Sequence, residues 1–250
     1  MPQRDPSPRK HFPSTIWNDV LAAGDRTQAN HRQRLEELLR TYWPPVFAYI
    51  RAAWRKSDED AADLTQAFFA LLLEKNTLAR LQPGLGSFRG YLKRAIQHFL
   101  VDRERHAARR RPDAPLLSMD SAELERIAPA APDEAPERAY DREWSRRLLD
   151  GAIDDLRTTL ASQGKSVYFD VFHAYFLHGA GATSSKLSRT DEQGPTYDDI
   201  AQRLGIKETD VRNHLTACRK MLKDLLRRRI RDYVESDDEV ESELEEMLKG

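Results

Sequence analysis

Cysteine is almost absent from the chain. Cys218 is the one cysteine among 250 residues, so no disulfide can form within the chain, which is typical of a protein from a reducing compartment. Long hydrophobic runs are also missing, because no stretch approaches the roughly 18 unbroken apolar residues that a membrane span needs. The N-terminus, "MPQRDPSPRK", has no apolar core of the signal-peptide kind. We therefore expect a cytoplasmic protein that does not insert into a membrane.

The usual signatures of catalysis are missing as well. The seven histidines show no paired ligand spacing, "GLGSFRG" is not a dinucleotide fingerprint, and "GAGATSSK" lacks the spacing of a phosphate-binding loop. Four acids cluster in "SDEDAAD", residues 57–63, as they do in some metal-dependent nucleases. Acids at a helix start are more often capping charges, and no clear second acidic group completes a site. We expect no catalytic residue, no metal site and no cofactor.

Net charge is close to zero, but the average conceals blocks of opposite sign. The formal charge of the whole chain is −1. Residues 88–111 carry eight bases and two acids, residues 207–231 carry nine bases and three acids, and residues 232–250 carry nine acids and one base. Two basic segments far apart in the sequence, followed by an acidic tail, predict that a polyanion binds at two places.

Helical periodicity dominates the chain, and the fold class expected is all-α. Adjacent prolines, Pro44 and Pro45, predict a break between two helices near the N-terminus. Five prolines, seven acids and no sustained periodicity in residues 112–139 are typical of a flexible linker, with at most one helical turn at "SAELERI". The expected parts are two small helical domains, that Pro/acid-rich linker and an acidic extension: residues 12–111, 140–234, 112–139 and 235–250.

The segment "DAADLTQAFFALLLE", residues 60–74, reads as a helix with more apolar surface than one buried stripe requires. The stripe expected to face the core has the spacing i, i+4, i+7 and i+8: Leu64, Phe68, Leu71 and Leu72. A second row lies beside it, with acids in the first turn: Gln66, Phe69 and Leu73, preceded by Asp60 and Asp63. The helix is therefore either thoroughly buried or presents an apolar strip edged by carboxylates to another protein.

Residues 196–226, "TYDDIAQRLGIKETDVRNHLTACRKMLKDLL", have the layout of a helix-turn-helix. Thr196 is placed to cap the first helix, small Ala201 permits a close crossing, and Gly205 stands where the turn requires positive φ. The residues expected to pack the two helices together are Ile200, Leu204, Ile206, Val211 and Leu215. The residues expected to face outward, toward groove edges and phosphates, are Lys207, Thr209, Asp210, Arg212, Asn213, Thr216, Arg219 and Lys220. This register favours DNA binding over a helical hairpin with a solvated basic face.

The first basic block interleaves cations with aromatic rings. In "FRGYLKRAIQHFLVDRERHAARRR" the aromatic residues Phe88, Tyr91 and Phe99 stand among arginines and lysines. Phosphates attract the charge and unstacked bases need a flat partner, so this mixture is typical of single-strand binding. We expect Phe99 to belong to the core and Phe88, at the edge of the preceding loop, to be available to nucleic acid.

Together these motifs resemble a bacterial RNA polymerase sigma factor of the extracytoplasmic-function type, in the subgroup with an acidic C-terminal extension. The resemblance implies that residues 60–74 dock on the polymerase, through Asp60, Asp63, Gln66, Phe69 and Leu73. It implies that the first basic block melts and reads the promoter element nearer the start site, through Ser87, Phe88, Arg89, Lys93, Arg94, Gln97 and Arg103. The helix-turn-helix would read the upstream element. The partners implied are core polymerase and promoter DNA, as duplex and as melted strand, with an anti-sigma factor or a regulatory kinase as further candidates.

Two departures from the family pattern stand out. Ala62 occupies a position where the family often has an acid, and the insert at residues 180–195 is longer than the usual link into the helix-turn-helix. The alternative function is a helix-turn-helix transcription regulator that never engages core polymerase. That alternative leaves the helix at residues 60–74 and the first basic block without a role.

The acidic tail contains its own helical stripe. The spacing i, i+4, i+7 and i+8 joins four apolar residues: Val240, Leu244, Met247 and Leu248. An amphipathic helix here could fold back on the helix-turn-helix domain and compete with phosphates for Arg219, Lys220 and the bases at 227–229. A docking surface for a partner and a solvated solubilising tail are the other interpretations.

Overall fold

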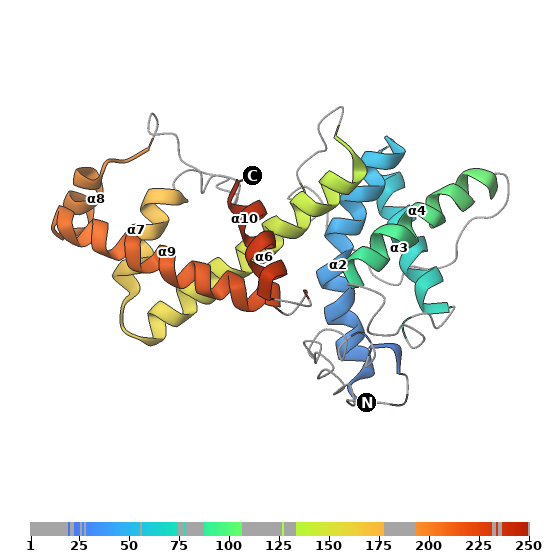
Figure 1. Ribbon diagram of the computed structural model, residues 1–250, viewed down its shortest axis with the longest axis horizontal. Helices are drawn as coiled ribbons and strands as arrows, with labels where there is room; N and C mark the ends of the chain where they lie inside the picture. The colour runs from blue at the N-terminus through green and yellow to red at the C-terminus, as the bar shows by residue number, and fades with distance from the viewer. Residues whose placement is uncertain are drawn as a thin grey trace, which may run out of the picture.

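Helices form all the regular structure in the part of the chain that the computed structural model describes, which confirms the all-α fold class. The described residues are 29–55, 57–74, 88–106, 134–177, 194–231 and 237–249, with 20, 23–25, 27, 78, 127 and 234. Figure 1 shows two lobes, one containing α2, α3 and α4 and the other containing α7, α8 and α9, with the long helix α6 running from one to the other. The predicted turn at "SAELERI", apart from Ile127, and the insert at 180–195, apart from its last two residues, lie outside the described residues.

Aromatic residues form the core of the first lobe. Its helices are α2 (His31–Trp54), α3 (Asp58–Glu74) and α4 (Phe88–His106). Trp43 of α2 stacks on Phe69 of α3 with ring centroids 5.6 Å apart, and Phe68 meets the edge of Phe99 of α4 at 5.6 Å. These contacts confirm Phe99 as a core residue, and they tie all three helices to one apolar centre.

Helix α2 continues through the two prolines, so the expected break there is wrong. Pro44 and Pro45 lie inside the helix, and both are buried. An interior proline costs a helix about 3 kcal/mol, because it removes an N–H donor and crowds the preceding turn. Here the neighbours Trp43 and Val46 are also buried, and their packing against the core outweighs that local cost. The helix ends instead at Arg55, which takes a left-handed conformation with φ of 49°.

Helix α6 (Pro136–Ser162) belongs to both lobes. It begins at Pro136, four residues before the domain start expected from the sequence, with proline in the first turn where its missing N–H is harmless. Near its start it packs along α2, where Trp144 stacks on Tyr42 at 5.1 Å; further along it packs on α7 and α9. The two lobes therefore share a continuous helix, and residues 136–139 of the expected linker are part of it.

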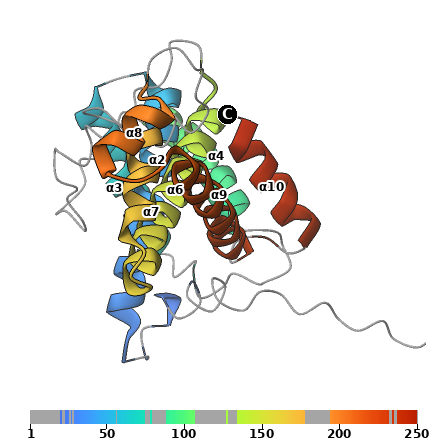
Figure 2. The same cartoon turned by 90° about the vertical axis from the view of Figure 1, so that its left-hand side faces the viewer.

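The second lobe consists of α7 (Ser166–Phe176), α8 (Tyr197–Leu204) and α9 (Glu208–Arg231), packed on the C-terminal half of α6. Its core contains Leu156 of α6, Phe172 of α7 and Leu215 of α9. The acidic tail forms α10 (Asp237–Lys249), which lies alongside α9 in Figures 1 and 2 and between the lobes in Figure 1. The expected helix in the tail is thus confirmed, and Val240 and Leu244 of its expected apolar stripe are buried against α9, whereas the side chains of Met247 and Leu248 lie outside the described residues.

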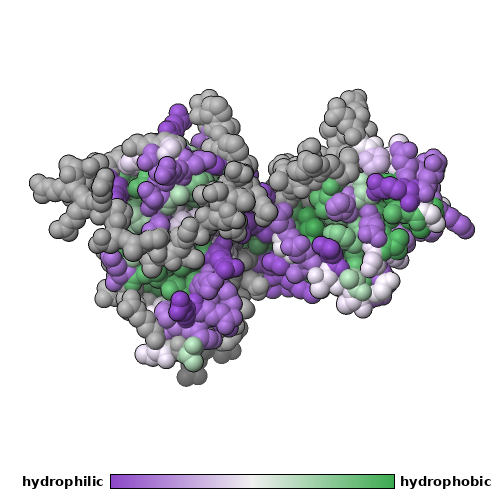
Figure 3. Space-filling view, turned by 180° about the vertical axis from the view of Figure 1, so that it is seen from behind, coloured by the Kyte–Doolittle hydropathy of each residue, from purple (hydrophilic) through white to green (hydrophobic). Residues whose placement is uncertain are grey.

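Polar residues dominate the narrow middle of the molecule in the space-filling view of Figure 3. On this face, charged and polar side chains cover the junction of the lobes, where Tyr42 and Trp144 stack inside. Among the helices described here, none is both long and apolar enough to span a lipid bilayer.

Candidate nucleic-acid interface

The first helix of the helix-turn-helix begins at a capping box. The Thr196 hydroxyl accepts a hydrogen bond from the Asp199 backbone N–H at 3.1 Å, and the Asp199 carboxylate accepts one from the Thr196 N–H at 2.8 Å. Hydrogen bonds from the Thr196 hydroxyl and backbone lower the pKa of Asp199 below its ordinary value. The cap predicted at Thr196 is therefore confirmed, and it fixes where α8 starts.

The turn and the packing also follow the predicted register. Gly205 ends α8 in the left-handed region with φ of 65° and ψ of 33°. Ile200, Val211 and Leu215 are fully buried, and Ala201 lies at the crossing with little exposure. Since α8 and α9 pack on each other and on α7, the orientation of α9 is fixed by apolar contacts from two sides.

The outer face of α9 carries an exposed polar and basic row. Seven of the eight residues expected to face outward are exposed: Lys207, Thr209, Arg212, Asn213, Thr216, Arg219 and Lys220. The eighth, Asp210, is half-buried and accepts a hydrogen bond from the Lys207 backbone N–H at 3.3 Å. The Asp210 carboxylate therefore satisfies a backbone N–H at the start of α9, as acids in the first turn of a helix often do.

Two arginines of this row rest on aromatic rings. The Arg212 guanidinium lies 5.5 Å from the Tyr197 ring centre and pairs with Glu208 at 2.7 Å, and the Arg219 guanidinium lies 5.2 Å from the Phe176 ring centre. Ring contacts of this kind hold a guanidinium in place while its N–H edge stays exposed. No local pattern in the sequence indicates these pairs, because the rings come from α7 and α8.

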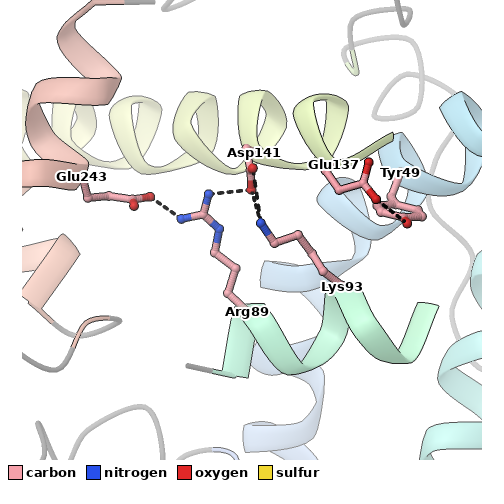
Figure 4. A network of polar contacts seen from close by, with 6 residues as sticks. All are labelled: Tyr49, Arg89, Lys93, Glu137, Asp141 and Glu243. Carbon is pink, nitrogen blue, oxygen red and sulfur yellow. Dashed lines mark hydrogen bonds and ion pairs between the residues drawn. The ribbon is translucent and has the colours of Figure 1, made fainter. Parts of the chain in front are cut away.

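Helix α4 presents one side to the rest of the protein. Phe88 is 3% exposed and meets the edge of the Tyr42 ring at 4.9 Å, so the expectation that Phe88 is available to nucleic acid is wrong. Arg89 and Lys93 are also engaged: Asp141 of α6 accepts from Arg89 Nη2 at 2.6 Å and from Lys93 Nζ at 3.0 Å (Figure 4). The other amino group of Arg89 bonds to Glu243 of α10.

The charge around Arg89 is balanced within the protein. Burial alone would lower the pKa of Arg89, but the facing carboxylates of Glu243 and Asp141 outweigh it and raise the pKa above the ordinary value. The guanidinium also lies 5.8 Å from the Trp144 ring centre. Arg89 is thus held on three sides by groups that α6 and α10 bring to it.

The opposite side of α4 faces outward. Arg94, Gln97 and His98 are exposed there, and Val101, at 42%, is the one exposed large hydrophobic residue in the described part of the chain. Arg103, half-buried, lies with its guanidinium 5.3 Å from the Phe99 ring centre. The residues expected to read a melted strand therefore fall on two sides of α4. Arg94, Gln97 and Arg103 lie on the outward side, whereas Phe88, Arg89 and Lys93 face the rest of the protein. Ser87 lies outside the described residues.

The buried stripe of helix α3 matches the expected one only in part, because Phe68 and Leu72 are buried as expected but Leu64 and Leu71 are not. Its buried residues follow the spacing i, i+4, i+7, i+8 and i+11: Ala61, Thr65, Phe68, Phe69 and Leu72, with Ala67 also buried. Phe69, at 1% exposure, belongs to the core, so its expected place on an exposed strip is wrong. The small residues at 61 and 65 are the sequence signal that was missed, since they let α3 approach its neighbours closely.

The outer side of α3 still combines acids with apolar residues. Asp60 and Asp63 are exposed, and Gln66 and Leu73 are half-buried. Ser57 caps the start of α3, because its hydroxyl accepts a hydrogen bond from the Asp60 backbone N–H at 3.1 Å, and the same hydroxyl donates to the Asp60 carboxylate at 2.9 Å. Leu64 and Leu71, expected in the core, are half-buried as well and so add apolar surface between the acids and the core.

No protein-family model, curated protein or solved structure matches this chain. Within the described residues no group of three histidine, cysteine, aspartate or glutamate side chains is placed to hold a metal ion.

Truncating Phe69 should destabilise the protein, because its ring fills space between Trp43 and Phe68. We expect Phe69→Ala to lower the free energy of unfolding by about 3 to 5 kcal/mol. The exposed substitution Asp63→Arg on the same helix should change it by less than about 0.5 kcal/mol. Urea denaturation followed by circular dichroism measures both, and a Phe69→Ala midpoint equal to that of the parent protein would contradict the packing.

The turn of the helix-turn-helix offers a test of backbone strain. A Cβ at Gly205 would meet no atom within 4 Å, so only its positive φ disfavours a side chain. We expect Gly205→Ala to cost about 1 to 2 kcal/mol of stability and Gly205→Asn to cost less, since asparagine tolerates this conformation. Equal melting curves for the two variants would show that the turn does not keep this φ.

Proposed function

We propose that the protein is a sigma factor of the extracytoplasmic-function type, which binds core RNA polymerase and directs it to specific promoters. The observation that carries the proposal is the exposed row on α9, held in register by the Thr196 cap, the Gly205 turn and the buried residues between α8 and α9. In a helix-turn-helix the second helix enters the major groove, and its outer side chains meet bases and phosphates.

The chemistry of the α9 row supports reading of duplex DNA. Arg212 and Asn213 lie in the N-terminal half of the helix, where the recognition helix of such a motif contacts base edges, and Arg and Asn form bidentate pairs with guanine and adenine. Arg219 and Lys220 lie two turns further on and suit phosphates. We assign this helix to the upstream promoter element.

The outer side of α4 supports contact with an unpaired strand. Arg94 supplies charge for a phosphate, Gln97 supplies donor and acceptor groups for a base edge, and His98 and Val101 supply flat or apolar surface. A base that has left the duplex needs all three kinds of partner. We assign this side of α4 to the melted element near the start site, and Phe88 is not part of it.

The outer side of α3 supports docking on polymerase. Asp60 and Asp63 offer negative charge, while Leu64, Leu71 and Leu73 offer partly exposed apolar surface. A protein interface usually combines an apolar centre with a polar rim. The polymerase surface that fits would carry basic residues around an apolar groove.

A helix-turn-helix regulator that never engages core polymerase is the alternative function. It would use the same α9 row, but it gives no role to the outer sides of α3 and α4. Co-purification of the full chain with core polymerase separates the two functions. Promoter-dependent transcription with purified core and the full chain would then establish initiation directly.

Charge reversal on α3 should remove core binding without unfolding the protein. We expect Asp63→Arg to lower the affinity for core polymerase at least about tenfold, because it replaces an exposed acid with a like charge toward the basic partner surface. Asp154→Arg, an equally exposed reversal on α6 in the second lobe, is the control and should bind normally. Retention of both variants on immobilised core polymerase measures the difference, and equal retention would exclude α3 as the docking surface.

The two DNA-binding sides should act on different forms of DNA. We expect Arg212→Ala and Asn213→Ala each to weaken binding of the polymerase complex to the upstream duplex element by about 1 to 3 kcal/mol. Gln97→Ala should spare that binding and reduce permanganate reactivity of thymines near the start site, because fewer bases are held out of the stack.

The control for these variants is Arg157→Ala, which removes an exposed cation from α6 outside both sides. It should leave duplex affinity and permanganate reactivity unchanged. If Gln97→Ala and Arg212→Ala lower duplex affinity alike and leave melting intact, the assignment of α4 to the unpaired strand is incorrect.

A further inference from the structure

Glu243 of the acidic tail pairs with a base of the opposite lobe. Helix α10 is joined to α9 by residues 232–236 and has its apolar side, Val240 and Leu244, buried against it. From that position Glu243 reaches Arg89 on α4, as Figure 4 shows. Tail and helix-turn-helix lobe thus form one body, and this ion pair ties that body to the first lobe.

A second ion pair fixes α10 on its own lobe. Arg227 of α9 donates to both carboxylate oxygens of Glu241, from Nε at 2.6 Å and from Nη2 at 3.1 Å. This fork uses one of the bases that the sequence suggested as targets of the tail, whereas Arg219 and Lys220 remain exposed. The tail therefore leaves the α9 row open and acts at the lobe junction instead.

The bases at this junction have the arrangement of a phosphate site. Arg89 and Lys93 lie one helical turn apart on α4, with side chains 17% and 28% exposed, and their N–H groups converge on carboxylate oxygens from α6 and α10. A phosphodiester offers the same kind of oxygens, and arginine binds both groups through the same fork. The carboxylates therefore occupy the places that phosphates of a nucleic acid would take.

We propose that α10 is an intramolecular latch: through Glu243, beside Asp141 of α6, it holds the lobes together and masks Arg89, and a single-stranded nucleic acid releases it by replacing Glu243 on that guanidinium. The proposal rests on the proposed function for the nature of the ligand. The closed contact itself is a property of the chain alone.

The energetics suit a latch that opens. Removing Glu243 without a substitute leaves a partly buried guanidinium with one partner fewer, so the closed form is favoured while no ligand is present. A polyanion supplies the missing partner and also releases its own counterions, which favours the open form. Because both competitors are anions bound to the same bases, added salt should weaken the closed contact and the nucleic-acid contact together.

The test uses full-length variants that differ by one carboxylate. Glu243→Gln removes the negative charge that faces Arg89 and keeps the size of the side chain at position 243, and the control Asp238→Asn removes one exposed charge from the same helix. Fluorescence anisotropy with a labelled single-stranded DNA of mixed sequence, at low salt, measures affinity. We expect Glu243→Gln to bind about 5 to 150 times more tightly than the parent, the usual range of coupling between two sites, and Asp238→Asn to match the parent within about twofold.

A double-variant cycle shows whether the gain passes through Arg89. In an Arg89→Gln background, Glu243→Gln should no longer raise the affinity, because the masked base is absent. An equal gain in both backgrounds would mean that Glu243 acts through general repulsion of DNA, which would overturn the latch. So would equal affinities of Glu243→Gln and Asp238→Asn.

Hydrogen exchange of the parent chain gives a readout apart from affinity. Saturating single-stranded DNA should speed amide exchange in residues 237–249, because α10 leaves its seat on α9 or loosens there; unchanged exchange with bound DNA would refute the proposal. Failure of the latch is distinguishable from failure of the proposed function. A latch that opens in a chain without affinity for core polymerase would contradict only the sigma-factor assignment. A chain that binds core polymerase but whose α10 does not open would contradict only the latch.

Discussion

The arrangement of the molecule depends on the contact between α2 and α6. Tyr42 and Trp144 stack with nearly parallel rings, 5.1 Å apart, and both side chains are buried. On the same seam the Tyr49 hydroxyl donates to the Glu137 carboxylate at 3.1 Å, and burial, together with that carboxylate, raises the pKa of Tyr49 to about 12. Helix α6 then continues into the second lobe. The contact between α2 and α6 therefore sets where α9 and α10 lie relative to α4.

Ion pairs also hold the packed helices together, in addition to the stacked rings of Tyr42 and Trp144. Arg89 and Lys93 meet Asp141 beside Trp144, and Arg229 of α9 pairs with Asp155 of α6 at 2.8 Å. Each of these pairs joins segments that are far apart in the sequence, and each is at least partly shielded from water. The near-zero net charge of the chain thus has a structural counterpart, since much of its basic surface faces acids of its own.

Two of the surfaces proposed to bind nucleic acid, the α9 row and the latch site on α4, differ in how they depend on the rest of the chain. The α9 row is fixed within the second lobe by a cap, a turn and three buried side chains, so its orientation needs nothing from α2, α3 or α4. The latch site proposed on α4 depends on its neighbours, because Asp141 of α6 pairs with Arg89 and Lys93 and Glu243 of α10 pairs with Arg89. Duplex recognition and single-strand recognition are therefore expected to respond differently to changes at the lobe junction.

The sequence by itself determined the features that arise from neighbours along the chain. The Thr196 cap, the Gly205 turn, the outward row of α9 and the stripe of the tail helix are set by residues within about two helical turns of one another, where hydrogen bonds and φ preferences act locally. Only the tertiary structure decided the burial of Phe69 and Phe88, the passage of α2 through Pro44 and Pro45, and the partners of Arg89. A helix with apolar residues on two sides can bury either one, and the choice depends on which helix packs there. Arg89 reads as a free base in the sequence because its partners stand 52 and 154 positions away, a separation that no local pattern records.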